Sequence, residues 1–270
     1  MSTAVQARLT PAEVARYRHD GYLLYQQPVL PEAKFQRLKA YFEDMLSVWP
    51  QDRRPEGMDV PHFTHPALFE WLFADEVLDL IEPILGPDIA LFSSHFICKP
   101  QGDGKRVPWH EDSAYWRDMV APMEVCTLWL AIDPSTRANG CMKIIPQTHS
   151  NGYSDYDPVD PNKNVFGTEI KATQRDDSRA VALELQPNQC SLHDGKLMHG
   201  SDANTSTQRR CGYTMRYISA GTRFNREKHG HYHQIYLARG KDRAGNVYGD
   251  PTQVANELMQ GRVKYGKKGH

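Results

Sequence analysis

The spacing of apolar residues changes near residue 89, and this change constrains the fold more than any other feature of the sequence. Before residue 89, apolar side chains recur every three or four positions, which is typical of amphipathic helices. After it, short apolar runs follow a period of two and are separated by Pro, Gly and Asn, which is typical of strands. This order favours a mainly β fold, a closed or sandwiched antiparallel sheet with helices packed on one side.

Three helical stretches are expected in the first third of the chain. Thr10-Pro11-Ala12-Glu13 has the form of a capping box and predicts a helix that Gly21 can end. A third stretch is predicted to begin at Pro66, with Asp75 as the cap of its continuation. The second helix follows Pro31, where one apolar stripe is formed by Phe35, Leu38, Tyr41, Phe42, Met45 and Leu46.

Six segments have the pattern of strands. They are residues 89–99, 124–133, 142–145, 180–185, 190–192 and 211–219. A long polar segment, residues 150–178, is expected to be either a lid or binding segment, or an insertion with no role. A chain of this length commonly folds as one unit, so we expect a single domain with a helical part over 10–86, a β core over 89–220 and an extension over 221–270.

Composition and charge argue against several classes of partner. A formal net charge of −1 gives no global electrostatic reason to bind nucleic acid or an anionic membrane. No apolar run reaches the roughly 18 residues that a membrane span needs, and residues 1–8 lack the apolar core of a signal peptide, so a cytoplasmic location is expected. The cysteines are expected to be small, buried residues in a reducing compartment: Cys98, Cys126, Cys141, Cys190 and Cys211.

His110-Glu111-Asp112 is the motif with the clearest chemical meaning. On a strand, residues i and i+2 point to the same side, so this imidazole and carboxylate could reach one point in space. With a second histidine they would form a 2-His-1-carboxylate triad, which leaves coordination positions open on a non-haem Fe(II) ion. His193 and His199 are the candidates for that histidine. Such a tripeptide is common by chance, so the surrounding sequence has to support the hypothesis.

An arginine lies eleven residues after His199. Arg210 opens an apolar run, and its planar guanidinium could hold a carboxylate in two-point contact beside a ferrous site. With this residue the sequence resembles the phytanoyl-CoA dioxygenase family, a branch of the Fe(II)/2-oxoglutarate-dependent oxygenases that includes ectoine hydroxylases. The matching segments cover about residues 10–220 and are Lys99-Pro100, Trp109-His110-Glu111-Asp112, Asn139-Gly140-Cys141-Met142, Pro146-Gln147-Thr148-His149, His193-Asp194-Gly195, His199-Gly200-Ser201 and Arg210.

The resemblance implies a double-stranded β-helix, a cupin-like jelly roll, as the core of a catalytic domain. The implied Fe(II) ligands are His110, Asp112 and His199. Arg210, assisted by the hydroxyl of Ser201, would bind the distal carboxylate of 2-oxoglutarate, and Trp129 would border this cosubstrate. Strand parity agrees, because Thr127, Trp129 and Ala131 share one face. The opposite face is wholly apolar: Cys126, Leu128, Leu130 and Ile132. A core tryptophan is the alternative interpretation of Trp129.

The resemblance also implies the reaction. Three protein ligands leave three positions on an octahedral Fe(II) for 2-oxoglutarate and O2. We expect hydroxylation of an aliphatic C–H bond of a small-molecule substrate, with release of succinate and CO2, by a monomer or homodimer. Asp112 is not the alanine or glycine of related halogenases, which favours hydroxylation. Glu111 and Gln147 depart from the family pattern, which often has glutamine and glycine there.

Two other functions stay open: a zinc-dependent hydrolase using the same triad, which would need no Arg210, and a non-catalytic cupin-like binding protein. The candidate substrate-binding residues are Tyr115, Trp116, His95 and Arg216. Arg216 shares the predicted strand face of Arg210. It could bind an acidic substrate group, or it could bind 2-oxoglutarate in place of Arg210. For each of the four, a packing or surface role is an equal alternative.

The C-terminal extension holds two further features. His229, His231 and His233 alternate and could form a second metal site, or lie near the mouth of the pocket. A short helix is predicted around residues 254–259. The basic end of the chain is interpreted as a solvated tail: Arg262, Lys264, Lys267 and Lys268.

Overall fold

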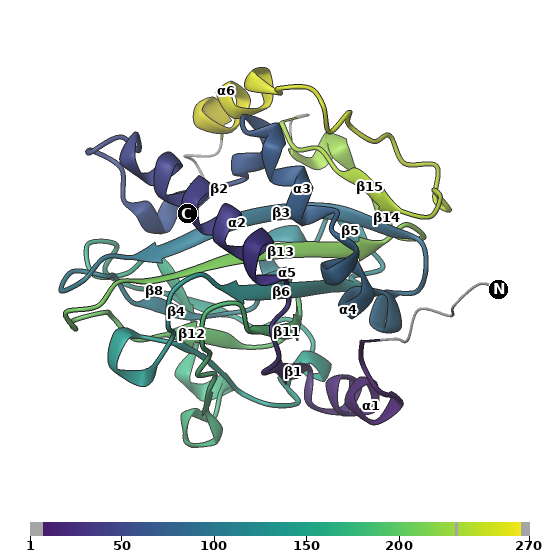
Figure 1. Ribbon diagram of the computed structural model, residues 1–270. Coiled ribbons are helices and arrows are strands. Elements are labelled where there is room, and N and C mark those ends of the chain that lie inside the picture. Colours follow the sequence, from purple (N-terminus) through teal and green to yellow (C-terminus); the bar gives the residue numbers. More distant parts are fainter. Residues whose placement is uncertain (1–7, 230–231, 266–270) are drawn as a thin grey trace.

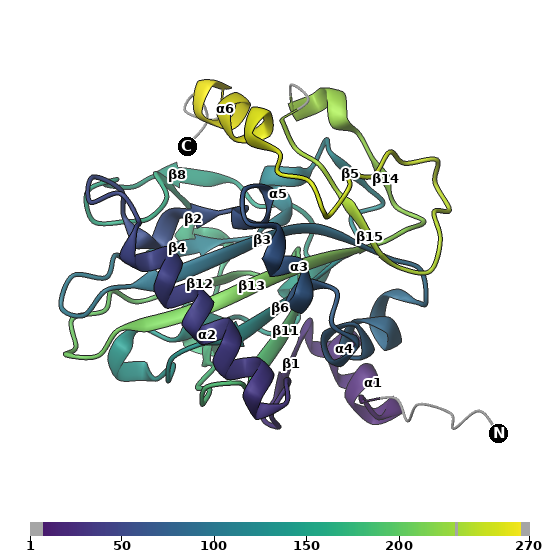
Figure 2. The ribbon, with the colours of Figure 1, turned by 45° about the horizontal axis from the view of Figure 1, so that its top comes forward.

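The computed structural model describes residues 8–229 and 232–265, without the side chains of residues 229 and 261–265. Two antiparallel β-sheets face each other, and helices cover the outer face of the larger sheet (Figure 1). Figure 2 shows the longest of these helices lying diagonally across that face. No helix within the described residues is long and apolar enough to cross a membrane.

The helices follow the predicted order. Their bounds are α1 Pro11–Asp20, α2 Glu32–Ser47, α3 Phe69–Leu72, α4 Asp75–Leu85, α5 Ser113–Trp116 and α6 Asn256–Tyr265. The 3-10 helices are η1 Pro55–Gly57, η2 Pro61–Phe63, η3 Pro66–Leu68, η4 Arg137–Asn139, η5 Thr148–Ser150, η6 Ala172–Gln174, η7 Asp177–Arg179 and η8 Arg226–His229.

The first helix has the capping box that its sequence predicts. The backbone N–H of Glu13 donates to Thr10 Oγ1, and the Glu13 carboxylate accepts from the Thr10 N–H. The helix ends at Gly21, whose φ of 81° favours glycine. The predicted cap at Asp75 is wrong, because the N-cap of α4 is Ala74 and Asp75 is already the first helical residue.

The larger sheet has seven strands within the described residues. It consists of β1 Tyr22–Tyr25, β2 Met58–Asp59, β3 Ile89–Lys99, β6 Val125–Ala131, β11 Cys190–Asp194, β13 Arg210–Ser219 and β15 Tyr236–Arg239. Their order is β1-β11-β6-β13-β3-β15, with β2 paired to β3. The smaller sheet has the order β10-β7-β12-β4 and consists of β4 Val107–His110, β7 Met142–Ile144, β10 Val181–Ala182 and β12 His199–Ser201. This arrangement is the expected double-stranded β-helix.

Six of the strands were predicted, and β3 has the predicted bounds. The strand predicted over 180–185 is only the two residues of β10. Five strands of these two sheets lie outside the prediction: β1, β2, β4, β12 and β15. Strand β1 follows α1 directly inside the helical third, and β4 and β12 are too short to show a period of two. Strands β4 and β12 carry the two candidate histidine ligands.

The predicted parity of β6 is confirmed. Its apolar face packs with the helices in the main core, where Leu128 and Leu130 join Leu38 and Phe42 of α2. The face that bears Trp129 points the other way, toward the smaller sheet and its residues Met142 and Ile144. All five cysteines are free and buried, as expected.

The long segment 150–178 contains its own hairpin, in which β8 Tyr156–Pro158 pairs with β9 Thr168–Ile170. Another small sheet joins β5 Val120–Ala121 to β14 Arg223–Phe224. The hairpin brings Phe166 against His110, with ring centroids 4.9 Å apart. The segment therefore contributes a side chain to the interior, and its role as a lid or binding segment stays a prediction. In the C-terminal extension, α6 lies where a short helix was predicted, and the basic tail side chains lie outside the described residues.

Candidate metal centre

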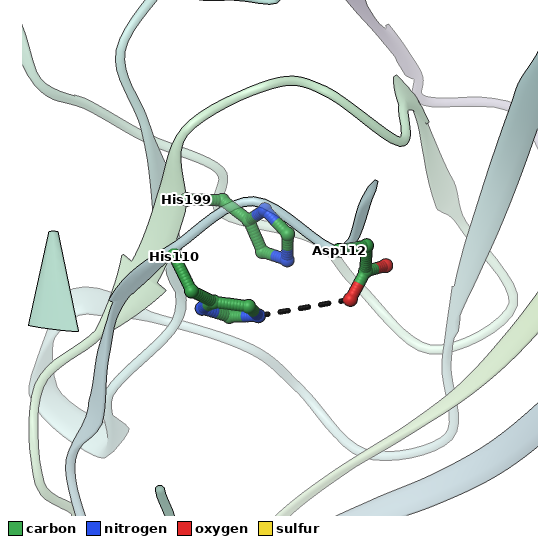
Figure 3. Close-up of side chains that lie close together, drawn as sticks. All are labelled: His110, Asp112 and His199. Atoms are coloured by element: carbon green, nitrogen blue, oxygen red, sulfur yellow. Dashed lines mark ion pairs between the residues drawn. The ribbon is translucent and has the colours of Figure 1, made fainter. Parts of the chain in front are cut away.

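Three buried side chains converge between the two sheets: His110, Asp112 and His199 (Figure 3). His110 ends β4 and His199 begins β12, and the two residues are direct partners in the ladder between these strands. One ligand atom from each of the three side chains lies within 4.8 Å of the other two. Within the described part of the chain, this is the one group of three or more such residues close enough to hold a metal ion.

Asp112 reaches this site by a different route from the one predicted. The strand ends at His110, and Asp112 has helical angles, φ −56° and ψ −37°, at the start of α5. Its Oδ1 lies 3.7 Å from Nε2 of His110 because the chain turns back there. The two side chains meet as predicted, but a turn brings them together and not the shared face of one strand. Glu111 points away from the triad and accepts from the Ser154 N–H at 2.7 Å.

Backbone carbonyls fix the tautomer of both histidines. Nδ1 of His110 donates to the Pro108 carbonyl at 2.8 Å, and Nδ1 of His199 donates to the Leu197 carbonyl at 2.9 Å. A carbonyl oxygen only accepts, so the proton of each neutral ring is on Nδ1 and Nε2 presents a lone pair. Burial, followed by the nearby His199, lowers the pKa of His110 to about 3, and burial also lowers the pKa of His199. Both rings are therefore in the form that binds a metal.

Arg216 keeps the carboxylate of Asp112 charged. Its Nε donates to Asp112 Oδ2 at 3.1 Å, so the other oxygen is left for a metal. Burial raises the pKa of Asp112, but Arg216 and then the two histidines lower it to a net value below its usual range. Two neutral nitrogens and one anionic oxygen, all buried, fit a divalent transition metal such as Fe(II).

Beside the triad, a cavity extends between the sheets. Its walls include the triad histidines and side chains from both sheets: Ile97, Val107, Trp129, Met142, Ser201, Arg210, Thr214 and Arg216. Val165 and Phe166 from the β8–β9 hairpin also line it. The cavity therefore joins the predicted metal centre to the predicted cosubstrate residues.

Arg210 lines this cavity, and its buried guanidinium has unused hydrogen-bonding capacity. Its Nη2 lies 3.4 Å from Ser201 Oγ, and its guanidinium lies 5.4 Å from the ring centroid of Trp129. No described residue accepts from its Nε. Burial lowers the pKa of this group to about 10, so it remains a cation at neutral pH. A buried cation without a carboxylate partner fits an anionic ligand.

Lys99 is a second buried basic side chain beside Ser201, and no role was predicted for it. It lies opposite Arg210 in the β3–β13 ladder, and its Nζ donates to Ser201 Oγ at 2.7 Å and to the Asp202 carbonyl. The available signal was a lysine at the end of a strand whose ends are otherwise apolar. Its burial on the cavity side depends on the pairing of β3 with β13, which the sequence does not contain.

The candidate substrate residues lie at different depths. His95 lines the cavity, and its Nε2 donates to the Glu56 carbonyl at 2.7 Å. Tyr115 packs against Phe166 behind the wall, and Trp116 packs on Phe92 with the Arg216 guanidinium 5.4 Å from its ring centroid. Of the four candidates, His95 and Arg216 are the ones among the described residues that line the cavity.

The alternating histidines near residue 230 are only partly described. His233 is buried, and its Nε2 donates to the Phe92 carbonyl at 2.9 Å. The side chain of His229 and the whole of His231 lie outside the described residues. The predicted second metal site stays a prediction.

Gly212 leaves room for the Trp129 ring to pack against β13. A Cβ at Gly212 would come within 2.0 Å of the Trp129 ring, so any side chain there must displace the indole. We expect Gly212→Ala to destabilise the fold by about 1–3 kcal/mol, as overpacking does, and to weaken 2-oxoglutarate binding because Trp129 borders Arg210. Urea unfolding and cosubstrate titration measure the two effects. Unchanged stability would show that the indole does not occupy this position.

A 2-His-1-carboxylate centre on a double-stranded β-helix, with a buried arginine beyond it, defines the class of mononuclear non-haem iron oxygenases. The sequence profile of the phytanoyl-CoA dioxygenase (PhyH) family matches residues 4–212. The chain therefore belongs to the phytanoyl-CoA dioxygenase family, as its motifs predicted.

Individual relatives agree with this assignment. The phytanoyl-CoA dioxygenase domain-containing protein 1 homolog of Dictyostelium discoideum is 31% identical over 160 residues, which cover 58% of this chain and 56% of that protein. The match thus spans little more than half of that relative's length. The apo form of the non-heme monooxygenase ThoJ has a TM-score of 0.72 at 21% identity, covering 94% of this chain and 95% of ThoJ. EctD from S. alaskensis with bound Fe has a TM-score of 0.66 at 19% identity, covering 82% and 81%.

Proposed function

We propose that the protein is an Fe(II)/2-oxoglutarate-dependent dioxygenase that hydroxylates an aliphatic C–H bond of a small-molecule substrate. The observation that carries this proposal is the pair of buried basic side chains, Arg210 and Lys99, around Ser201 in the same cavity region as the triad. A metal hydrolase has no use for such an anion site. A cosubstrate with two carboxylates does, because one end can bind the metal while the other is held by the protein.

The residues have separate tasks in this proposal. His110, Asp112 and His199 would hold Fe(II), and Arg210, Lys99 and Ser201 would hold the distal carboxylate of 2-oxoglutarate. When bound, iron supplies the oxidation of C–H by O2, coupled to conversion of 2-oxoglutarate to succinate and CO2. Trp129 and the β8–β9 hairpin exclude water from the cavity. Arg216 fixes the carboxylate of Asp112, which is a positioning role.

Lys99 makes the stability of the fold depend on pH. Burial, and next the neighbouring Arg210, lower the pKa of Lys99 from 10.5 to about 6. Between these values the unfolded chain binds a proton that the folded, ligand-free protein does not, so Lys99 makes the free energy of unfolding rise with pH. Lys99→Met removes this contribution. We expect the stability of the wild type relative to Lys99→Met to increase by up to about 1.4 kcal/mol per pH unit above pH 6.

Urea unfolding of the metal-free proteins between pH 6.5 and 9 measures this difference, and a flat difference would contradict a buried, neutral Lys99. The same variant should bind 2-oxoglutarate about 10- to 100-fold more weakly, as expected for a lost charged hydrogen bond. Unchanged cosubstrate affinity would show that Lys99 does not bind 2-oxoglutarate.

The test of the proposed function is turnover. Purified protein with Fe(II), 2-oxoglutarate and O2 is screened against small acids, amino acids and acyl thioesters for substrate-stimulated release of succinate. We expect one class of compound to raise succinate release, with hydroxylated product formed in equal amount. A zinc hydrolase would instead retain Zn(II) and act without 2-oxoglutarate. Succinate release that no compound stimulates, together with Zn(II)-dependent hydrolysis, would contradict the proposal.

A further inference from the structure

His193 is a buried histidine without a hydrogen-bond partner. It lies on β11 with 1% of its surface exposed, and no described residue bonds to either ring nitrogen. The ring lines the same cavity, and its centroid lies 4.9 Å from that of His199. An unpaired imidazole in this place lowers the stability of the fold. Such a group is expected where a ligand supplies the missing partner.

Two other residues in the same row of the sheet also have hydrogen-bonding groups that are not used. In the register of the larger sheet, His193 lies opposite Thr127, and Thr127 lies opposite Arg216. The Thr127 hydroxyl is buried and has no partner among the described residues. Arg216 uses Nε for Asp112 and Nη1 for Thr214, and no described residue accepts from its Nη2. Three side chains with unused capacity therefore form one row beside the triad.

The charge of the occupied site favours an anion in this row. In the proposed function, the charge of Fe(II) and that of the 2-oxoglutarate dianion cancel. The two positive charges of Arg210 and Arg216 and the one negative charge of Asp112 then leave a net charge of +1. Glu56, which also lines the cavity, is already paired with Arg54. A buried excess of positive charge is costly unless an anion neutralises it, and protonated Lys99 would increase the excess.

We propose that His193, Thr127 and Arg216 form the subsite for the acidic group of a small carboxylic acid substrate, with His193 as a specificity-determining residue. This inference rests on the proposed function. The imidazole N–H, the hydroxyl and the free Nη2 of Arg216 would donate to the substrate carboxylate. The subsite lies on the larger sheet, whereas the iron ligands come from β4, β12 and the start of α5. Substrate and metal would therefore be held by different walls of the cavity.

The experiment compares the wild type with His193→Leu and Thr127→Val, which replace the polar groups by apolar ones of similar size. Anaerobic protein loaded with Fe(II) and 2-oxoglutarate is titrated with short mono- and dicarboxylic acids, 2-hydroxy acids and amino acids. The methyl ester of each acid is the neutral control. The readouts are the change in the visible charge-transfer band and the thermal unfolding of the metal-free proteins.

We expect at least one acid to bind the wild type at least tenfold more tightly than its ester, and both variants to lose that preference. Both should keep the band, and His193→Leu should raise the Tm of the metal-free protein by about 2–4 °C, because an unpaired polar group is removed. Rescue of binding by His193→Gln would support hydrogen bonding as the cause.

Three results would overturn the subsite: no acid binds the wild type, esters bind as tightly as acids, or His193→Leu keeps the preference. A lower Tm for His193→Leu would contradict the unpaired state of the ring. If the wild type forms no charge-transfer band, the proposed function itself fails. A normal band without selective acid binding rejects only the subsite.

Discussion

Asp112→Ala should lower the affinity for Fe(II) by about 100-fold or more, since loss of a ligand costs at least as much as loss of its supporting partner. Asp112 is the one anionic donor of the triad, and without it the site offers two neutral imidazoles. The change also leaves the Arg216 guanidinium buried beside an empty space. Arg216 and Asp112 are 10% and 6% exposed, so breaking this pair should destabilise the metal-free fold by about 3–5 kcal/mol.

Asp112→Asn separates these two effects. The amide oxygen can still accept from Nε of Arg216, so the fold should be largely kept, while a neutral amide remains a weak ligand. Glu111→Gln is the matched control, because this adjacent buried carboxyl group bonds to Ser154 and faces away from the triad. Iron titrations and urea unfolding provide the readouts. Equal Fe(II) affinity in wild type and Asp112→Asn would show that Asp112 is not a ligand.

Arg210→Ala should weaken 2-oxoglutarate binding by about 100- to 1000-fold while changing Fe(II) binding little. Loss of one partner from a buried, hydrogen-bonded charge pair commonly costs 2–5 kcal/mol, which corresponds to an effect of this size. Arg210 contacts Ser201 and Trp129 in the cavity and makes no contact with the triad that would affect the metal. Cosubstrate and metal titrations on the same protein distinguish the two affinities.

Arg209 is the matched control for this prediction. It is the preceding residue, and its guanidinium lies on the other side, where it pairs with Glu43 and Asp133. Arg209→Ala should lower stability and leave both affinities near those of the wild type. If Arg210→Ala weakened iron and 2-oxoglutarate equally, or if Arg209→Ala weakened 2-oxoglutarate as much, the assignment of the cosubstrate arginine would be wrong.

Local sequence signals predicted the helices and long strands well, because the formation of these elements depends on residues that are close in the sequence. The capping box at Thr10 and the alternation over β6 are complete within a few positions of the chain. The short strands β4 and β12 have no such signal, since His110 and His199 are extended only because they pair with each other. Their roles were predicted from the family motifs and from Arg210.

Contacts between distant segments explain what could not be predicted. Lys99 is buried beside Arg210 because β3 and β13 are neighbours, and Arg216 holds Asp112 across 104 positions of the sequence. The sequence indicated that His193 was a candidate ligand, but the fold places it on the opposite sheet from the triad strands. Its unpaired nitrogens become visible only when every neighbour is known.

We propose that His110, Asp112 and His199 hold one ferrous ion and that Arg210 holds 2-oxoglutarate in contact with it. The most direct measurement is the anaerobic absorption spectrum of the wild-type protein with Fe(II), before and after 2-oxoglutarate is added. We expect a weak visible charge-transfer band that requires both components, since bidentate chelation of iron by the cosubstrate produces it. Folded, iron-loaded protein that shows no such band with saturating 2-oxoglutarate would contradict the claim.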